Sequence, residues 1–298
     1  MMSYNEYGHA PRNPPNFDGG FTRQLTYFIR QRYMILPYLY TLFYQAHLNG
    51  SPVARPLFYE FPGDMGSREI SSQFLLGEHL LVSPVFQSLE NGTSVQLKVH
   101  FPPGCWYNWY SGSIISDSYN GTDQTIATLL SDLNVNVRGG AVIPLQGRLE
   151  NFINTTADVS QQPFYLLVAL TCPSSTPNDI QQGFNTSAKG MLYVDDGITP
   201  VDQNPPVENL DMKVDNNQLS VTRLPPPAAG NPNGLCDHPT NLSTSINKVI
   251  VYGAPKVTKL FVDGAIHNFT QTDDTLALHI KDINYDWCVS SQLNITWV

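Results

Sequence analysis

The N-terminal part of the chain contains one long apolar helical segment. A helical pattern runs from about Phe21 to His47, and the stretch from Tyr33 to Tyr44 is almost entirely apolar or aromatic. A helix that is apolar on every side belongs in the core of a large domain or in a membrane, and this segment is too short to cross a bilayer. The ring of Pro37 opposes the carbonyl of Tyr33, so we expect a kink near Tyr33.

Beyond about residue 80 the chain has the pattern of β-strands. Alternating or β-branched runs are separated by Gly, Asn, Asp and Pro, which favour turns. The expected strands are 94–101, 133–145, 164–170, 191–197, 248–253, 257–264, 275–280 and 292–298. This spacing is typical of antiparallel β-sandwiches. Upstream, residues 51–61 have the pattern of a buried strand followed by a loop, and residues 148–162 are the expected domain boundary.

Composition and charge narrow the functional classes. The 298 residues are 41% hydrophobic and 11% aromatic, which is typical of a globular chain of two or three domains. The net charge is −9, and the 16 Lys and Arg residues form no run, which disfavours nucleic acid as a partner. No run reaches the length of a membrane span, and the first 20 residues lack the apolar region of a signal peptide.

Sequons and cysteines indicate the secretory pathway. Of eight Asn-x-Ser/Thr sequons, the one at Asn49 is the weakest because Pro52 follows its serine. The other candidate glycosylation sites are Asn91, Asn120, Asn154, Asn185, Asn241, Asn268 and Asn294. Four cysteines fit one or two disulfides, and no CxxC or Cys/His pair suggests a metal site. They are Cys105, Cys172, Cys236 and Cys288. We expect a lumenal protein, lysosomal or extracellular, whose true N-terminus and signal peptide lie upstream of this chain.

Six sequence blocks follow one another along most of the chain. They are "RYMILPYLYTLFYQAHLNGSPVARPLFYEFPGD" (32–64), "QFLLGEHLLVSPV" (73–85), "FPPGCWYNWYSG" (101–112), "LNVNVRGGAVIPLQG" (133–147), "QQPFYLLVAL" (161–170) and "LYVDDG" (192–197). In this order they resemble the C-terminal part of the α-glucosidases of glycoside hydrolase family 31, closest to the branch of lysosomal α-glucosidase. The intestinal maltase and sucrase enzymes belong to the same family. Beyond about residue 240 only scattered strand matches continue the resemblance.

The resemblance implies a mainly β fold in three parts. Residues 1–80 would form the C-terminal end of a (β/α)₈ catalytic barrel, with one long helix and one strand. Residues 81–150 would form a proximal antiparallel β-sandwich domain, and residues 151–298 a distal one. Four cysteines allow three pairings. Because Cys236 and Cys288 would both lie in the distal domain, we expect these two to be paired.

The resemblance also implies a glycosidase that needs no metal or cofactor. The family hydrolyses terminal α-linked glucose of oligosaccharides or glycogen-type substrates with retention, using two aspartates about 5 to 5.5 Å apart. The nucleophile motif W-x-D-M-N-E and the R-W-x-G stretch before the second aspartate have no counterpart here, and His9 does not match the R-N-H-N motif of the substrate-binding histidine. We therefore expect no catalytic residue in this chain, which alone would be inactive; the residues that bind the α-glucoside substrate stay unknown. The alternative is a β-sandwich carbohydrate-binding module or a non-catalytic fragment.

Two pairs of carboxylates are candidates for a general acid and a general base. Asp195 and Asp196 in "VDDG" would point to opposite faces of a strand, and Asp-Gly favours a turn, so a turn is the expected role. Glu60 and Asp64 lie on the loop after the presumed last barrel strand. For this second pair we expect a structural role rather than catalysis.

Arg55 and an aromatic cluster also have two interpretations. Arg55 lies in a segment expected to be buried, where an unpaired guanidinium is costly, so we expect a carboxylate or carbonyl partner. The cluster of aromatic residues at 106–110 could stack on sugar rings, but packing in a core is the more frequent role. Its members are Trp106, Tyr107, Trp109 and Tyr110.

The apolar helix provides a test of this interpretation. If its packing partners lie in an upstream part of a longer enzyme, some of its large side chains should be exposed in this chain. We expect exposed apolar surface at Leu36, Leu39, Tyr40 and Phe43.

Overall fold

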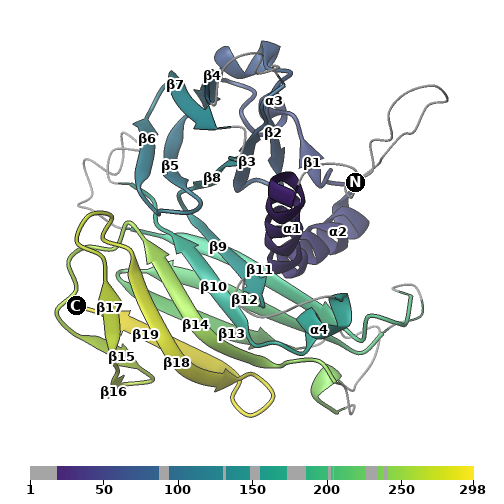
Figure 1. The fold of residues 1–298 in the computed structure, drawn as a ribbon. Coiled ribbons are helices and arrows are strands. Elements are labelled where there is room, and N and C mark those ends of the chain that lie inside the picture. The colour runs from purple at the N-terminus through teal and green to yellow at the C-terminus, as the bar shows by residue number, and fades with distance from the viewer. Residues whose placement is uncertain are drawn as a thin grey trace.

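The structure is a computed structural model with helices near the N-terminus and sheets over the rest of the chain (Figure 1). It describes residues 19–86, 94–129, 132–147, 155–172, 186–200, 203, 205–225, 234–237 and 241–298. The mainly β fold expected from the sequence is confirmed. No helix in these ranges is long and apolar enough to span a membrane.

Two consecutive helices form the expected helical segment. Helices α1 (Gly19–Met34) and α2 (Leu36–Asn49) are separated at Ile35, so the helix is interrupted close to the expected position. Pro37 thus lies in the first turn of α2, where a missing N–H breaks no intrahelical hydrogen bond. The proline therefore starts a helix rather than weakening the middle of one.

The two helices pack on the large sheet through α2. Helix α1 has no buried residue, and α2 buries Pro37, Tyr38, Thr41 and Leu42. The hydroxyl of Thr41 accepts a hydrogen bond from the backbone N–H of Tyr193 in the large sheet, at 3.1 Å. Of the four side chains expected to be exposed, two are exposed and two half-buried. The exposed ones are Tyr40 (43%) and Phe43 (59%), and the half-buried ones are Leu36 and Leu39.

A six-stranded antiparallel sheet joins residues on both sides of position 80. Its order is β1 (Ala54–Arg55), β2 (Phe74–Leu76), β3 (Leu80–Ser83), β8 (Asn134–Arg138), β5 (Gly104–Asn108) and β6 (Ile114–Ser118). A separate hairpin consists of β4 (Ser94–Phe101) and β7 (Thr122–Leu129). A small apolar core lies where these two sheets meet the short helix α3 (Leu57–Glu60). It contains Leu57, Phe61, Leu75, Leu81, Val99, Phe101 and Trp106.

The buried strand followed by a loop that was expected over residues 51–61 is found only in part, because a short helix takes the place of the loop. Only Ala54 and Arg55 are in a strand, and α3 (Leu57–Glu60) follows. Pro56 has the extended conformation (φ −68°, ψ 155°) and precedes the first helical residue, so the chain turns there into a short helix. A 3₁₀ turn, η2 (Gly66–Glu69), follows and leads toward β2.

An eleven-stranded sheet makes up most of the remaining chain. Its order is β16 (Ala265–Ile266), β15 (Leu260–Val262), β19 (Gln292–Trp297), β13 (Gln218–Leu224), β12 (Val207–Asp215), β11 (Ala188–Asp195), β9 (Ala141–Gln146), β10 (Phe164–Ala169), β14 (Ser245–Tyr252), β18 (Leu278–Asp286) and β17 (Phe269–Gln271). The short helices α4 (Thr156–Ser160) and η4 (Leu235–Asp237) lie in its connections. The sheet curls (Figure 1), and strands far apart in its order, such as β13 and β18, share one core.

The pairing in the large sheet differs from the expected antiparallel pattern at two places. Strands β10 and β14 are parallel, with Leu166 opposite Val249, and β9 and β11 are parallel at Ala141 and Lys189. Beside this second pairing, a Cβ on Gly190 would lie 2.0 Å from the carbonyl oxygen of Val142. Only glycine therefore allows β11 to approach β9 so closely.

Strands β9 and β10 are buried on both faces. Leu166 and Val168 face the core enclosed by the curled sheet. Leu145 and Leu167 face a second core, which α2 and the six-stranded sheet complete through Tyr38 and other side chains. Burial on both faces explains why both strands have nearly continuous apolar sequences instead of alternation. The division into parts at residues 80 and 150 stays a prediction.

Candidate functional site

The charged side chains buried in the described part of the chain lie in separate polar clusters. The four residues are Arg55, His100, Asp195 and Glu208. A buried charge is costly unless another group pairs with it, so the partner of each defines what its cluster can do. The segments that supply the partners lie in different sheets and turns.

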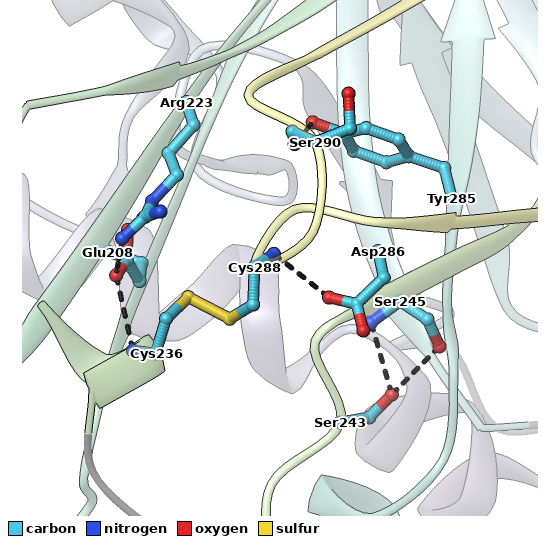
Figure 2. The surroundings of a disulfide bond; sticks show 9 residues. All are labelled: Glu208, Arg223, Cys236, Ser243, Ser245, Tyr285, Asp286, Cys288 and Ser290. Atoms are coloured by element: carbon cyan, nitrogen blue, oxygen red, sulfur yellow. Dashed lines mark hydrogen bonds and ion pairs between the residues drawn. A yellow bond between two sulfur atoms is a disulfide. The ribbon is translucent and has the colours of Figure 1, made fainter.

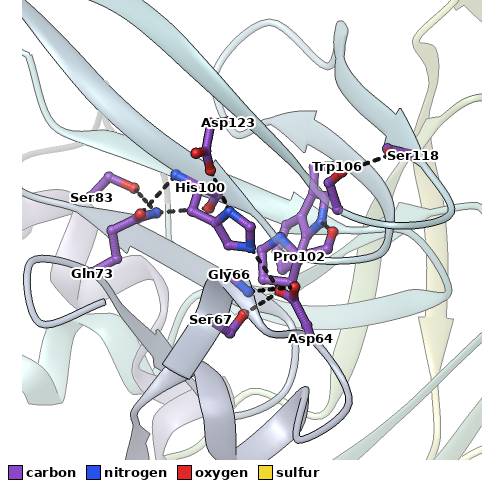
Figure 3. A network of polar contacts seen from close by, with 11 residues as sticks. Asp64, Gly66, Ser67, Gln73, Ser83, His100, Pro102, Trp106, Ser118 and Asp123 are labelled. Carbon is purple, nitrogen blue, oxygen red and sulfur yellow. Dashed lines mark hydrogen bonds and ion pairs between the residues drawn. The ribbon is translucent and has the colours of Figure 1, made fainter. Parts of the chain in front are cut away.

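His100 lies between two aspartates (Figure 3). Its Nε2 is 2.7 Å from Oδ2 of Asp64, on the loop between α3 and η2, and its Nδ1 is 2.5 Å from Oδ1 of Asp123 on β7. The side chain of Gln73 holds the backbone of β4 in place, since it accepts from the N–H of His100 and donates to its carbonyl, at 2.8 and 3.0 Å. The hydroxyl of Ser67 donates to Asp64 at 2.5 Å. A surface cavity of about 730 Å³ borders this histidine cluster.

The two aspartates favour the protonated form of His100. Burial alone would lower the pKa of His100, but the hydrogen bonds and charges of Asp64 and Asp123 outweigh it and raise the pKa. Burial would raise the pKa of Asp64, and the hydrogen bonds from Ser67 and His100 lower it instead. A general acid of a glycosidase needs a carboxyl with a raised pKa, so Asp64 is shifted in the wrong direction for that role. The cluster links the α3–η2 loop to the β4–β7 hairpin.

Arg55 has the partners expected from the sequence. Its guanidinium pairs with Glu60, and its Nε donates to the carbonyl of Pro52 at 2.6 Å. Glu60 is thus engaged by Arg55, whereas Asp64 is engaged by His100. The two carboxylates for which a structural role was expected therefore have separate partners.

Asp195 links α2 to the end of β11. Its carboxylate accepts from the hydroxyl of Tyr40 at 2.7 and 2.9 Å, from the hydroxyl of Tyr193 at 3.0 Å and from the N–H of Gly197 at 2.8 Å. Asp196 caps the following turn by accepting from the N–H of Thr199 at 2.8 Å. Burial and then Asp195 raise the pKa of Tyr40, so the phenol stays a donor. The two aspartates lie at the start of the β11–β12 connection, as a turn motif does.

Most of the aromatic cluster packs in the core. Trp106, Tyr107 and Trp109 are 0, 1 and 9% exposed, so the packing interpretation is confirmed for these three. Tyr110 differs, because 44% of its surface is exposed. Tyr107 donates its hydroxyl to the carbonyl of Leu170 at 2.9 Å and so links the six-stranded sheet to the large one.

All four cysteines are paired. Cys236 is bonded to Cys288, the pairing expected from the sequence, and Cys105 is bonded to Cys172. Figure 2 shows the first pair beside Glu208 on β12, whose carboxylate pairs with Arg223 through two contacts of 2.6 Å. The Cys105–Cys172 bond connects β5 to the segment that follows β10, and so to the large sheet.

The candidate glycosylation sites differ in exposure. Asn120, Asn241 and Asn268 are exposed. Asn294 is half-buried on β19, where its Oδ1 accepts from the hydroxyl of Ser220 at 3.1 Å. Asn91, Asn154 and Asn185 lie outside the described residues.

The described residues contain no group of three or more His, Cys, Asp or Glu side chains that could hold a metal ion. The histidine cluster has only one imidazole, and both of its nitrogens are hydrogen-bonded to carboxylates. Sequence reasoning missed this cluster because Asp64, His100 and Asp123 come from three segments without a common motif.

Known proteins resemble this chain both in sequence and in fold. Residues 50–143 match the family described as "Glycosyl hydrolase family 31 C-terminal domain". An uncharacterized family 31 glucosidase of Schizosaccharomyces pombe is 30% identical over 99% of the chain and 27% of its own length. Lysosomal alpha-glucosidase of Mus musculus is 35% identical over 66% of the chain and 20% of its own length. The chain thus spans 20 to 27% of the length of these two relatives.

The fold matches as well. The crystal structure of a glucosidase II alpha subunit in its Glc1Man2-bound form superposes with a TM-score of 0.77 and 22% identity, over 98% of this chain and 31% of that one. The order of the sequence blocks, the family match and the shared fold agree with one another. This chain therefore belongs to glycosyl hydrolase family 31.

Proposed function

We propose that this chain is the C-terminal, non-catalytic portion of a retaining α-glucosidase that releases terminal α-linked glucose from oligosaccharides or glycogen-type substrates. The catalytic aspartates would lie outside residues 1–298. The chain would support the catalytic barrel through its helices and its sheets. Its similarity to family 31 glucosidases over 20 to 27% of their length supports this role.

The state of the buried carboxylates carries the proposal. Retention requires two carboxyls facing one glycosidic bond, one of them free to act as nucleophile and the other protonated. In the described part of the chain, Asp64 and Glu208 are held by His100 and Arg223, and Asp195 by two tyrosine hydroxyls. These groups fix the fold and are not available for both steps of the reaction.

An assay of the 298-residue chain tests this proposal. We expect no hydrolysis of maltose or of an aryl α-glucoside, while purified lysosomal alpha-glucosidase serves as the positive control. The variants Glu60→Gln, Asp64→Asn and Asp195→Asn would be assayed beside it. Hydrolysis by the chain that one of these substitutions abolishes would refute the proposal.

We also propose that the protein works in the lumen of the secretory pathway, in a lysosome or outside the cell. The two disulfides support this, because such bonds persist in oxidising compartments. After expression in a eukaryotic secretory host, a non-reducing gel with thiol labelling should detect no free cysteine. Labelling of one or more cysteines in the folded protein would contradict the proposal.

A further inference from the structure

A cavity of about 530 Å³ lies between α1 and the outer face of the large sheet. Helix α1 borders it with Tyr27 and Gln31, and the turn after β5 borders it with Trp109 and Tyr110. Strands β10, β14 and β18 form its opposite wall. The volume lies within the range of about 300 to 1,000 Å³ found for small-molecule sites. Of the groups described above, only Trp109 and Tyr110 of the aromatic cluster border it.

One wall of the cavity is a row of side chains across four neighbouring strands. Tyr165 on β10 is paired with Leu145 on β9 and with Lys248 on β14, and Lys248 is paired with Lys281 on β18. All four line the cavity, as does Asp282, which follows Lys281. The row thus changes from apolar at Leu145 to charged at Lys281, with a phenol between them.

The hydroxyl of Tyr165 is buried and has no hydrogen-bond partner in the described part of the chain. The residue as a whole is 9% exposed. A buried donor without a partner is uncommon in folded proteins, and it needs a physical reason. Because Tyr165 lines the cavity, a ligand with hydroxyl groups could supply that partner.

Aromatic side chains form the other wall. Tyr27 and Tyr110 are 40 and 44% exposed, so part of each ring is accessible. Trp109 is held in place there, since its indole N–H donates to Gln31 at 3.4 Å and its carbonyl accepts from the hydroxyl of Tyr252 at 3.0 Å. The cavity therefore combines a fixed aromatic surface with hydrogen-bonding groups on the facing wall.

We propose that this cavity binds a short α-glucan. A sugar ring has an apolar face of C–H groups, which fits Tyr27 and Tyr110, and a rim of hydroxyls, which fits Tyr165, Lys281 and Asp282. The charged groups at the cavity are Lys248, Lys281 and Asp282, which can donate hydrogen bonds to hydroxyl groups and accept hydrogen bonds from them. The choice of an α-linked glucan rests on the proposed function, whereas the sugar-binding chemistry rests on the cavity itself. Such a site would retain a polymeric substrate near the enzyme.

Calorimetric titration of the 298-residue chain with maltotetraose tests the proposal. We expect saturable binding, about tenfold weaker in Tyr110→Ala because an aromatic surface is lost. The matched control is Tyr119→Ala, which removes an exposed tyrosine (55%, against 44% for Tyr110) from the turn at the histidine cluster and should bind like the wild type. Intrinsic fluorescence gives a second readout, because Trp106, Trp287 and Trp297 are fully buried and Trp109 lines the cavity.

The variant Tyr165→Phe separates a binding role from a structural one. We expect it to weaken maltotetraose binding about three- to tenfold, the range of one neutral hydrogen bond. Its unfolding temperature should equal or exceed that of the wild type, because the removed hydroxyl has no partner to lose. The proposal is wrong if maltotetraose does not bind, or if Tyr110→Ala and Tyr165→Phe both bind it like the wild type. Equal binding of cellotetraose would overturn the assignment to an α-glucan.

This result is independent of the test of catalysis. The titration measures binding without turnover, so an inactive chain can still bind maltotetraose. A chain that does not bind it leaves the position of the catalytic aspartates unaffected.

Discussion

At the scale of single residues, the histidine cluster should make stability depend on pH. The pKa of His100 is raised in the folded chain, so its stabilising effect is complete below its unfolded pKa of about 6.5 and is lost as the pH rises through the folded value. The pKa of Asp64 is lowered, so its effect is present above about pH 4 and is lost as the pH falls through the folded value. The cluster therefore stabilises the fold most between about pH 4 and 6.5.

Urea unfolding at pH 5.5 and pH 9 should detect this effect. Replacement of the imidazolium in His100→Gln should lower the free energy of unfolding at pH 5.5 by about 1.5 to 3 kcal/mol, the range of a hydrogen bond to a charged group. The variant should lose much less at pH 9, where the wild-type histidine is closer to neutral. His47→Gln, which replaces an exposed histidine on α2, is the control and should match the wild type at both values. An equal loss for His100→Gln at both pH values would show that the histidine acts by packing alone.

The pair of Glu208 and Arg223 gives a second prediction for single residues. Glu208 is 1% exposed, so Arg223→Met would leave an uncompensated carboxylate in the core. We expect the free energy of unfolding to fall by about 3 to 5 kcal/mol in urea titrations at pH 7. The double variant Glu208→Gln/Arg223→Met should recover much of this loss, because no buried charge remains. A double variant as unstable as Arg223→Met would contradict this explanation.

At the scale of elements, Pro37 is expected to stabilise α2. It lies in the first turn, where a proline ring fits the backbone and removes no intrahelical hydrogen bond. Pro37→Ala should therefore lower the free energy of unfolding by about 0.4 to 1 kcal/mol, because the unfolded chain gains conformational freedom. Leu39→Pro, one turn into the helix, should cost about 3 kcal/mol or more. If Pro37→Ala instead raises the unfolding temperature, the proline is a source of strain.

The local sequence pattern predicts where helices and strands form better than it predicts which strands pair with one another. The apolar sequence of β10 predicts a buried strand, and Phe164–Ala169 is one. The pattern says nothing about its parallel neighbour β14, about 80 residues further on, because pairing between distant segments depends on tertiary packing. In the segment 51–61, the strand ends at Arg55 and a helical turn replaces the expected loop for a local reason, the extended Pro56 before that turn. The histidine cluster could not be predicted from the sequence for the same reason. Asp64, His100 and Asp123 become neighbours only when three distant segments pack together.

At the scale of the whole molecule, β9 and β10 should couple its parts. Leu166 faces the core of the curled sheet, and Leu167, the next residue, faces the core shared with α2 and the six-stranded sheet. Strand β10 thus contributes side chains to both cores. If one core unfolds and β10 leaves it, the other core loses the same strand. We therefore expect a single unfolding transition, even though the sequence suggests separate proximal and distal domains.

Two probes and two variants test this coupling. The tryptophans report different regions, with Trp106 in the core near α3 and Trp287 and Trp297 in the curled sheet. Thermal unfolding followed by tryptophan fluorescence and by far-ultraviolet circular dichroism should give coincident curves. Leu166→Ala and Leu167→Ala should each lower the free energy of unfolding by about 2 to 5 kcal/mol and shift both curves together. If Leu166→Ala shifts only one of two separate transitions, the curled sheet unfolds independently, and the proposed boundary near residue 150 separates two folding units.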